Sequence, residues 1–459
     1  MTTARQENAR TLAVLLNLDE GQAEKLLDAT AVITSGAGGE PLADNIGALL
    51  ARTLTTVRYD VAPNVQANVE VVVGSVTPRT TAPIVGVGVG DYRLEVRDGA
   101  SALGTNAAHD LIVLIAAGYA AAIAAHRALG LDASVALRLP IEIDFTALYG
   151  PGIARLHRRL DLGLAYLAGA GAIGNAVVLG LSTLDVHGEL QVCDPDKVSD
   201  GNLNRCWWFT PADIGEKKCA RLAHNAQPEV PGLRLVPRDG TLKQAFKADG
   251  EKPIETMIVA ADSRRVRRSL QSEMPRRVYD ASTTGIEEFV LHFNEIPSDL
   301  ACMSCIYYED ADERTHETHV ADLLGISAAD VRASFVSAAA ARAILEKYPH
   351  LRVEDVEGQA CDTLFKQLCA RGELKGGNDD GERVLAPFGF VSVLAGLYLA
   401  LEIALRVHAT NDAPNCNFWR LSPWSAPVAR ARVQREKRPN CEFCGNPILQ
   451  EVVRGLWRP

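Results

Sequence analysis

The residues most able to do chemistry are three glycines followed by a carboxylate. Gly169, Gly171 and Gly174 fit the pattern G-x-G-x-x-G between a short apolar strand and a helix. Glycines permit a tight turn and close approach of the backbone to a phosphate, which the N–H groups of the helix start can bind. Asp194 follows 20 residues after the third glycine, at the end of the next strand, where a carboxylate meets ribose hydroxyls. Together these features predict a nucleotide site and leave NAD and ATP both open.

The loop after Asp194 favours ATP. It carries Asn202-Leu203-Asn204-Arg205, and Lys218 follows farther along. In isolation, Arg205 would be a surface salt-bridge residue and Lys218 an exposed helix residue. Behind a glycine loop, however, an arginine and a lysine can hold a polyphosphate and stabilise the charge that develops when it is cleaved. A dehydrogenase does not need them.

These elements, in this order, resemble the ThiF/MoeB/HesA and ubiquitin-activating enzyme superfamily. That family's pattern runs G-x-G-x-x-G, D-x-D-x-V, S-N-L-x-R-Q, G-x-x-K and then a D-N pair after an apolar strand. The chain matches it at the three glycines, Asp194, Asp196, Val198, Asn202, Leu203, Arg205, Gly215, Lys218 and Asp262. It departs from the pattern with Gly201 for the serine, Cys206 for the glutamine and Ser263 for the asparagine.

The resemblance implies that the chain adenylates a carboxylate with ATP and Mg²⁺. The residues expected to bind ATP or its metal are Gly169, Gly171, Gly174, Asp194, Asp196, Asn202, Leu203, Asn204, Arg205, Lys218 and Asp262. Asp194 would bind the ribose, Asn202, Arg205 and Lys218 the phosphates, and Asp262 would help to place Mg²⁺, with Arg205 and Asp262 acting in catalysis. The family's reaction joins two anions, so cationic side chains, a helix dipole and a metal must screen them.

Four arginines lie between positions 264 and 268. A run of like charges on a short helix is typical of a solvated face. We therefore expect most of this run to face water. The resemblance singles out only Arg267 as a structural or near-site residue.

Two C-x-x-C pairs predict a structural metal. Each pair supplies two thiolates, and two pairs complete a tetrahedral zinc site at Cys302, Cys305, Cys441 and Cys444. A single C-x-x-C would have left a redox role open. Because four protein ligands leave no open coordination position, this zinc is not catalytic.

A catalytic cysteine is less well defined. Members of the family that conjugate proteins transfer the adenylated tail to a cysteine. Cys361 lies at the start of a predicted helix, where the dipole lowers a thiol pKa, although the neighbouring Asp362 would raise it. Cys369 lies in the same helix, on the apolar face of Phe365, and is the alternative nucleophile. A third reading is that neither cysteine reacts.

Alternating strands and helices predict an α/β fold, and the resemblance makes it a Rossmann-like ThiF-type adenylation domain with a mostly parallel sheet. We expect an N-terminal, inactive, adenylation-like domain without a glycine loop, a split adenylation domain with the zinc clamp, and a helical insertion carrying the candidate cysteine and a crossover loop. Their bounds are 1–149, then 150–298 with 387–459, and 299–386.

Two long apolar helices, 109–129 and 387–408, resemble each other. An internal repeat or shared Ala/Leu composition would each explain the likeness. The apolar run 111–125 is about 15 residues, too short for a membrane span of roughly 20.

The composition narrows the function classes. The net charge of −10 argues against a nucleic-acid surface. A polar N-terminus without a signal peptide, and cysteines arranged for metal rather than disulfides, favour the cytoplasm and no membrane.

The leading hypothesis is a bacterial ubiquitin-like-protein activating enzyme that adenylates a partner's C-terminus and loads it on a cysteine. Its partners would be a ubiquitin-like protein and a ubiquitin-conjugating-type enzyme, in an antiphage conjugation system. A homodimer is one oligomeric state left open. Activation of a sulfur carrier for cofactor biosynthesis is the second hypothesis. An NAD-dependent oxidoreductase and an inactive scaffold both leave Arg205, Lys218 and Asp262 unexplained.

Overall fold

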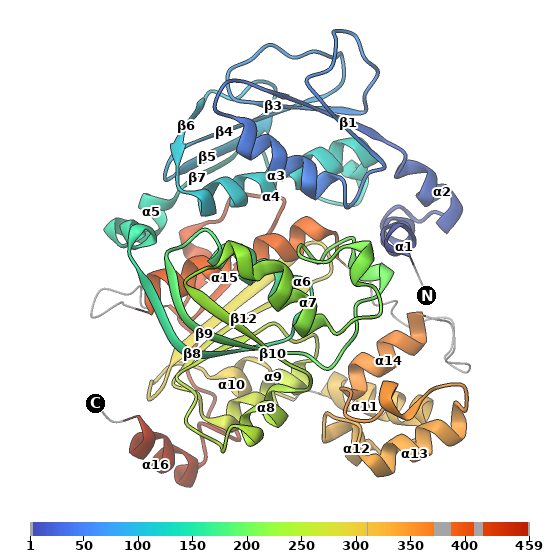
Figure 1. Cartoon of the computed structure of the whole chain (residues 1–459), viewed down its shortest axis with the longest axis vertical. Helices are drawn as coiled ribbons and strands as arrows, with labels where there is room; N and C mark the ends of the chain where they lie inside the picture. Colours follow the sequence, from blue (N-terminus) through green and yellow to red (C-terminus); the bar gives the residue numbers. More distant parts are fainter. Residues whose placement is uncertain (1–2, 310, 371–386, 408–415, 458–459) are drawn as a thin grey trace.

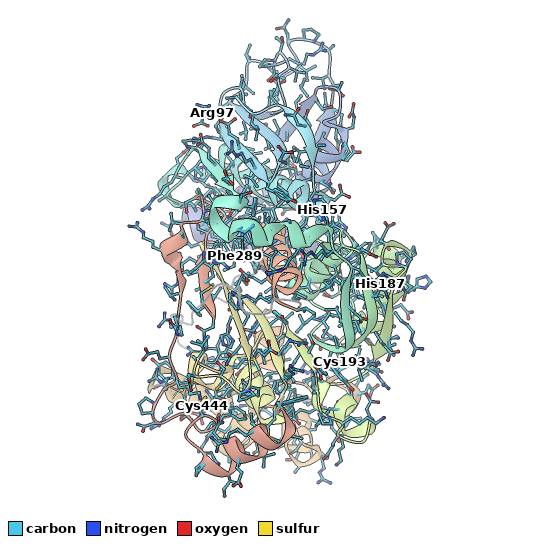
Figure 2. The ribbon with its side chains drawn as sticks, turned by 90° about the vertical axis from the view of Figure 1, so that its left-hand side faces the viewer. Arg97, His157, His187, Cys193, Phe289 and Cys444 are labelled. Atoms are coloured by element: carbon cyan, nitrogen blue, oxygen red, sulfur yellow. The ribbon has the colours of Figure 1, made fainter. Side chains whose placement is uncertain are left out.

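Two sheets lie on either side of a pair of long central helices (Figure 1). The computed structural model describes residues 3–309, 311–370, 387–407 and 416–457. A view turned by 90° places Arg97 of the N-terminal sheet and Cys444 of the cysteine cluster at opposite ends of the molecule (Figure 2). The cysteine cluster and the N-terminal sheet are therefore far apart.

The N-terminal sheet has strand order β2-β1-β3-β4-β5-β7, and β6 pairs with β4. Strands β1 to β4 are parallel, whereas β5 runs antiparallel to both of its neighbours, β4 and β7. The elements are α1 (Ala4–Leu16), α2 (Glu20–Leu26), β1 (Thr30–Ser35), α3 (Glu40–Leu50), β2 (Thr56–Tyr59), β3 (Val69–Val73), β4 (Ile84–Asp91), β5 (Arg93–Asp98), β6 (Thr105–Ala108), α4 (Asp110–Leu129), β7 (Ile141–Asp144) and α5 (Phe145–Tyr149).

One expectation for this region was wrong: it does contain a glycine loop. Gly36, Gly38 and Gly39 join β1 to α3, and Gly38 has φ +81°. The loop is nevertheless packed from within. A Cβ on Gly39 would lie 2.8 Å from the side chain of Val73, and Glu40 occupies the first turn of α3. An acidic residue at a helix start disfavours a bound phosphate, in contrast to the open, uncharged start of α6.

The second sheet has strand order β10-β9-β8-β11-β12-β13-β14-β15. It is parallel from β10 to β12 and antiparallel from β12 to β15. Its elements are β8 (Leu160–Ala168), α6 (Ala172–Leu181), β9 (Val186–Cys193), α7 (Lys218–Ala226), β10 (Leu233–Arg238), α8 (Leu242–Ala248), β11 (Thr256–Val259), α9 (Arg264–Leu270), β12 (Arg277–Thr284), β13 (Glu288–Glu295), α15 (Gly389–Arg406), β14 (Phe418–Leu421), β15 (Arg432–Val433) and α16 (Pro447–Leu456). This arrangement confirms the mostly parallel α/β fold.

A helical insertion follows β13 and has its own apolar core. It comprises α10 (Met303–Ile306), α11 (Ala311–Leu324), α12 (Ala328–Arg332), α13 (Ala338–Lys347) and α14 (Cys361–Ala370). Val320, Leu324, Ile344 and Leu368 are all fully buried in this core. Residues 371–386, which end the predicted insertion with its crossover loop, lie outside the described residues.

The two long helices, α4 and α15, pack against each other at the centre. Both are long and apolar enough to cross a membrane, but 83% and 94% of their apolar windows are buried inside the protein. Gly118 allows the close approach, since a Cβ there would lie 2.7 Å from the side chain of Leu394. The hydroxyls of Tyr119 and Tyr398 lie 3.3 Å apart across the contact. They are core helices, which join the two sheets into one body.

Candidate functional site

The glycine loop between β8 and α6 requires each glycine for a different reason. Gly169 has φ +103°, and a Cβ there would lie 2.7 Å from the carbonyl oxygen of Ala260. A Cβ on Gly174 would lie 2.1 Å from the carbonyl oxygen of Gly169. No heavy atom lies within 4 Å of a Cβ built on Gly171, which caps α6 and lines the cleft. Two glycines therefore shape the loop, and Gly171 leaves room for a ligand.

Asn175 holds the loop in place, and the sequence motif did not identify it. Its buried amide group donates hydrogen bonds to the carbonyls of Ala170 (2.8 Å) and Gly171 (3.0 Å). Its Oδ1 accepts from the backbone N–H of Trp208 at 2.9 Å. The only signal for this role in the sequence is a polar residue directly after the third glycine, inside an otherwise apolar helix.

Asp194 also secures the loop. Its carboxylate accepts hydrogen bonds from the N–H groups of Ala170 (2.7 Å) and Asp196 (2.8 Å). Burial raises the pKa of Asp194, against the opposing effect of Lys218. Each carboxylate oxygen retains a second acceptor direction, so a ribose contact remains compatible with these bonds.

Lys218 lies at the start of α7 and pairs with Asp196, with Nζ 2.8 Å from Oδ2. Burial alone would lower its pKa, but the two carboxylates of Asp196 and Asp194 raise it, so the ammonium stays charged. Both residues line the cleft. A polyphosphate would compete with Asp196 for this lysine.

Arg205 lines the cleft and is held by its neighbours. Its Nη1 donates to the carbonyl of Gly201 (2.7 Å) and to Oδ1 of Asn204 (2.8 Å). Asn204 is only 1% exposed, and its amide group donates to Oδ1 of Asn8 on α1 at 2.7 Å. Asn204 is therefore directed away from the cleft, where it orients Arg205 and ties it to the N-terminal helix.

The remaining residues predicted to bind ATP either line the cleft or support the loop from outside it. Asn202 lines the cleft and accepts from the N–H of Ser199 at 2.9 Å. Leu203 packs partly buried against the main core, and Gly174 supports the loop from behind. For Leu203, Asn204 and Gly174 the structure thus gives supporting positions, rather than places on the cleft wall.

Asp262 follows β11 and faces the insertion. The hydroxyl of Thr363 on α14 donates to both of its carboxylate oxygens, at 2.9 and 3.0 Å. Arg267 is buried nearby and pairs with Asp280, while its guanidinium also donates to the carbonyl of Ala281 at 2.8 Å. The expected structural role of Arg267 agrees with this position.

A cleft of about 1780 Å³ connects these groups. It runs from the glycine loop past Asp262 to Ser282 and Thr284 of β12, and on to Phe418 of β14. Because the sheet order is β8-β11-β12-β13-β14, the cleft crosses the sheet on one side. It brings a nucleotide-sized site and a long approach path together.

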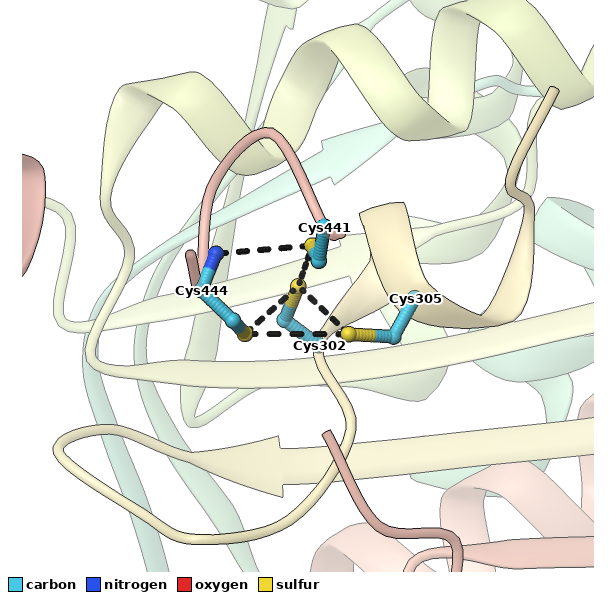
Figure 3. A group of neighbouring side chains, drawn as sticks. All are labelled: Cys302, Cys305, Cys441 and Cys444. Carbon is cyan, nitrogen blue, oxygen red and sulfur yellow. Dashed lines mark hydrogen bonds between the residues drawn. The ribbon is translucent and has the colours of Figure 1, made fainter. Parts of the chain in front are cut away.

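The four paired cysteines form one cluster (Figure 3). All four Sγ atoms lie within 4.8 Å of one another, and neighbouring sulfurs are 3.3 to 3.8 Å apart. Tetrahedral zinc with Zn–S bonds of about 2.3 Å requires sulfurs about 3.8 Å apart. Backbone N–H groups of Arg438 and Cys444 point at the sulfurs of Cys305 and Cys441, both at 3.4 Å. The cluster fits a thiolate-bound zinc.

Cys361 starts α14 as expected, but its thiol faces the core of the insertion. The residue is fully buried, and Sγ lies 3.7 Å from the carbonyl oxygen of Asp330. Burial, with Asp362 adding to it, raises the pKa of Cys361 to about 12. Attack on an adenylate would therefore need α14 to move. Cys369 lies in α14, and its side chain is outside the described residues.

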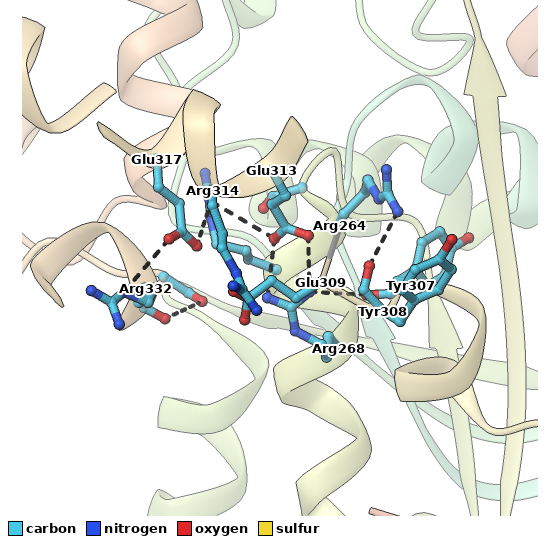
Figure 4. Close-up of polar contacts among 12 residues, drawn as sticks. Arg264, Arg268, Tyr307, Tyr308, Glu309, Glu313, Arg314, Glu317 and Arg332 are labelled. Carbon is cyan, nitrogen blue, oxygen red and sulfur yellow. Dashed lines mark hydrogen bonds and ion pairs between the residues drawn. The ribbon is translucent and has the colours of Figure 1, made fainter. Parts of the chain in front are cut away.

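The arginine run on α9 is not a solvated face, so that expectation was wrong. Arg265 is 3% exposed and pairs with Asp362 and with Glu317, the latter at 3.1 Å. Arg268 binds both carboxylate oxygens of Glu313 at 3.0 Å (Figure 4). These partners lie in the insertion, which is therefore anchored to the adenylation domain by buried ion pairs.

Two family models match this chain. The ThiF family model matches residues 158–443, and the E1 N-terminal domain model matches residues 1–151. Similar solved structures include E. coli MccB with MccA-N7isoASN (TM-score 0.39, 15% identity, 64% of this chain and 69% of that chain) and E. coli MccB with ATP (0.37, 13%, 64% and 68%). The microcin C7 biosynthetic enzyme MccB with N-formylated MccA is also similar (0.34, 14%, 61% and 69%). No curated protein matches.

Proposed function

Because this chain belongs to the ThiF family of ATP-dependent adenylating enzymes, we propose that it adenylates the C-terminal carboxylate of a ubiquitin-like protein. The observation that supports this most directly is the cleft, which joins the glycine loop, Arg205 and Lys218 to a path across the sheet toward Phe418. A flexible protein tail needs such a path, whereas a small acid would need only a pocket.

In the proposed reaction, a tail carboxylate oxygen bonds to the α-phosphorus of ATP while the bond to the bridging oxygen breaks, and pyrophosphate leaves. A phosphate fits the open space at Gly171, where the N–H groups at the start of α6 donate hydrogen bonds to it. Asp194 binds the ribose. Arg205 and Lys218 stabilise the charge that collects on the departing pyrophosphate. Mg²⁺, held near Asp262, would screen the phosphates, and each Asp262 oxygen keeps a second acceptor direction beside its hydrogen bond from Thr363.

Thioester transfer to Cys361 is a further part of the proposal. The reaction would move the acyl carbon from the adenylate oxygen to Sγ and release AMP, after α14 had exposed the thiol. A ubiquitin-conjugating-type partner, a cytoplasmic location and a role in a bacterial antiphage system complete the proposal, on the strength of the family resemblance.

The burial of Cys361 also favours a second candidate, activation of a sulfur carrier. That function ends at the adenylate and needs no reactive thiol in this position. The two candidates differ in whether a covalent enzyme adduct forms.

One experiment tests both. The purified chain is mixed with ATP, Mg²⁺ and a ubiquitin-like protein encoded nearby, and ATP–pyrophosphate exchange and a DTT-sensitive adduct are measured. Exchange with an adduct lost in Cys361→Ala supports the activating enzyme. Exchange without an adduct supports the sulfur-carrier function, and an adduct lost only in Cys369→Ala would reassign the nucleophile. The absence of exchange would refute adenylation itself.

A further inference from the structure

Three arginines meet the cleft on the β14 side of the sheet. Arg420 lies on β14, and Arg435 and Arg438 follow β15; all three are exposed and line the cleft. We call them the arginine row. The whole chain carries a net charge of −10, whereas the arginine row adds three positive charges to this part of the cleft.

Aromatic rings hold two of the guanidinium groups in place. The guanidinium carbon of Arg435 lies 4.7 Å from the ring centroid of Phe418, and that of Arg438 lies 3.4 Å from the ring of Tyr308. A stacked guanidinium keeps its N–H edges available for a planar carboxylate. Stacking also reduces the side-chain entropy that binding would otherwise cost.

Within the described part of the chain, only Arg420 of the row has an ion-pair partner. Arg420 lies 3.5 Å from Glu288, but both side chains are more than a third exposed. Neither Arg435 nor Arg438 has an ion pair anywhere in the described part of the chain, although Lys437 between them pairs with Asp299 at 3.6 Å. Two oriented cations therefore face the cleft without an ion pair of their own in the described part of the chain, although the exposed carboxylate of Glu436 lines the cleft between them.

The cysteine cluster fixes the backbone of the row. The N–H of Arg438 points at Sγ of Cys305 at 3.4 Å. The N–H of Arg435 donates to Oδ1 of Asn417 at 2.7 Å, and its carbonyl accepts from the N–H of Ala301, the residue before Cys302. The cysteine cluster thus holds the backbone of Arg438 directly, and the residue next to Cys302 holds that of Arg435.

We infer that the arginine row is the docking surface for an acidic segment of the protein whose tail is adenylated. This inference rests on the proposed function, since it names a property of that partner. Ser282, Thr284 and Gly285 line the cleft between the row and the nucleotide site, and they leave room for an extended tail of small residues. The acidic segment would sit where the tail joins the folded body of the partner.

A nucleic acid is the other polyanion that such a row could attract. The row has only three arginines, and the chain around it is acidic, which repels a long phosphate backbone. The observations favour a short acidic protein segment.

Binding of defined peptides tests the inference. Three fluorescein-labelled peptides, with a run of glutamate, glutamine or lysine before a C-terminal Gly-Gly, are titrated with the full chain without ATP, and anisotropy is measured. We expect the glutamate peptide to bind tightest and to weaken as salt is raised. In an R435Q/R438Q double variant its Kd should rise about 3- to 30-fold, as expected for losing two partly exposed ion pairs.

The matched control is R430Q/R454Q, which removes the same charge from two exposed arginines that do not line the cleft. Its Kd should stay within about twofold of the wild type. Equal binding of the three peptides, equal loss in both double variants, or tighter binding of a single-stranded oligonucleotide would overturn the inference. ATP–pyrophosphate exchange is measured separately. A chain that binds the glutamate peptide but catalyses no ATP–pyrophosphate exchange would refute adenylation without refuting the docking surface.

Discussion

Replacing Gly171 with alanine should weaken ATP binding without unfolding the protein, whereas Gly174→Ala should destabilise the fold. The two positions differ in what surrounds them. A Cβ on Gly174 would lie 2.1 Å from a backbone oxygen, whereas no heavy atom lies within 4 Å of a Cβ on Gly171. A backbone oxygen is unable to yield as a flexible side chain does, so Gly174→Ala should cost about 1–3 kcal/mol or more.

For Gly171→Ala the stability terms nearly cancel. Gly171 is the N-cap of α6 in an extended conformation, φ −73° and ψ −160°, which alanine adopts without strain. Alanine is a poorer N-cap than glycine by up to about 1 kcal/mol, but it lowers the entropy of the unfolded chain by about 0.4–1 kcal/mol. We expect a net change within roughly 0.5 kcal/mol.

The methyl group would instead occupy the space into which a phosphate fits. Losing one charge-assisted hydrogen bond costs about 1.5–3 kcal/mol, which is roughly a 10- to 150-fold increase in the Kd for ATP. Calorimetry gives this Kd, and thermal unfolding gives the stability. Gly104→Ala is the control, because it is also in open space but lies in the N-terminal sheet region. This account of the loop would be refuted if Gly171→Ala left the Kd for ATP unchanged and Gly174→Ala left the stability of the fold unchanged.

Three further predictions concern the groups around the loop. Asn8→Ala removes the partner of Asn204 and should lower kcat/KM for ATP–pyrophosphate exchange roughly 10-fold, whereas Lys25→Ala on the neighbouring α2 should not; equal effects would argue against a link between α1 and Arg205. Cys441→Ser should lose one zinc per chain in native mass spectrometry and lower the Tm, whereas Cys416→Ser should retain the metal; zinc content unchanged in Cys441→Ser would contradict the clamp. Burial raises the pKa of Cys361 to about 12, so this thiol stays protonated through neutral and mildly alkaline pH and should react slowly with iodoacetamide from pH 7 to about 9. A labelling rate that rises with a midpoint near about 8.5, as for an exposed thiol, would show that Cys361 is accessible.

The sequence was sufficient where function depends on short-range spacing. Glycines two and three residues apart and each C-x-x-C pair carry their own local geometry, so the glycine turn and the two cysteine pairs were predicted correctly. That the pairs, 139 residues apart, form one cluster followed from the four ligands that zinc requires, not from spacing. The N-terminal glycine loop was missed, although the sequence contains its signal: Gly36, Gly38 and Gly39 directly follow a β-branched strand.

Features built from distant partners were beyond the sequence. Arg265 reads as a solvated cation until Glu317 and Asp362 are brought to it from the insertion, 52 and 97 residues later. Asn204 and Asn8 are 196 residues apart, and Thr363 and Asp262 are 101 apart. Propensity and local spacing hold no information about such pairs, since tertiary packing alone makes them neighbours.

The order of strands in the second sheet also has a consequence for synthesis. β13 (Glu288–Glu295) ends well before its neighbour β14 (Phe418–Leu421) begins, and the helical insertion and α15 lie between them. At a translation rate of roughly 5–20 residues per second, the ribosome needs about 6 to 25 seconds to deliver the missing strand. During that time β13 has an unpaired edge, and the face of β12 and β13 that α15 contacts is uncovered. A nascent chain of this protein therefore passes through an aggregation-prone, partly folded stage, in which we expect chaperone binding to matter most.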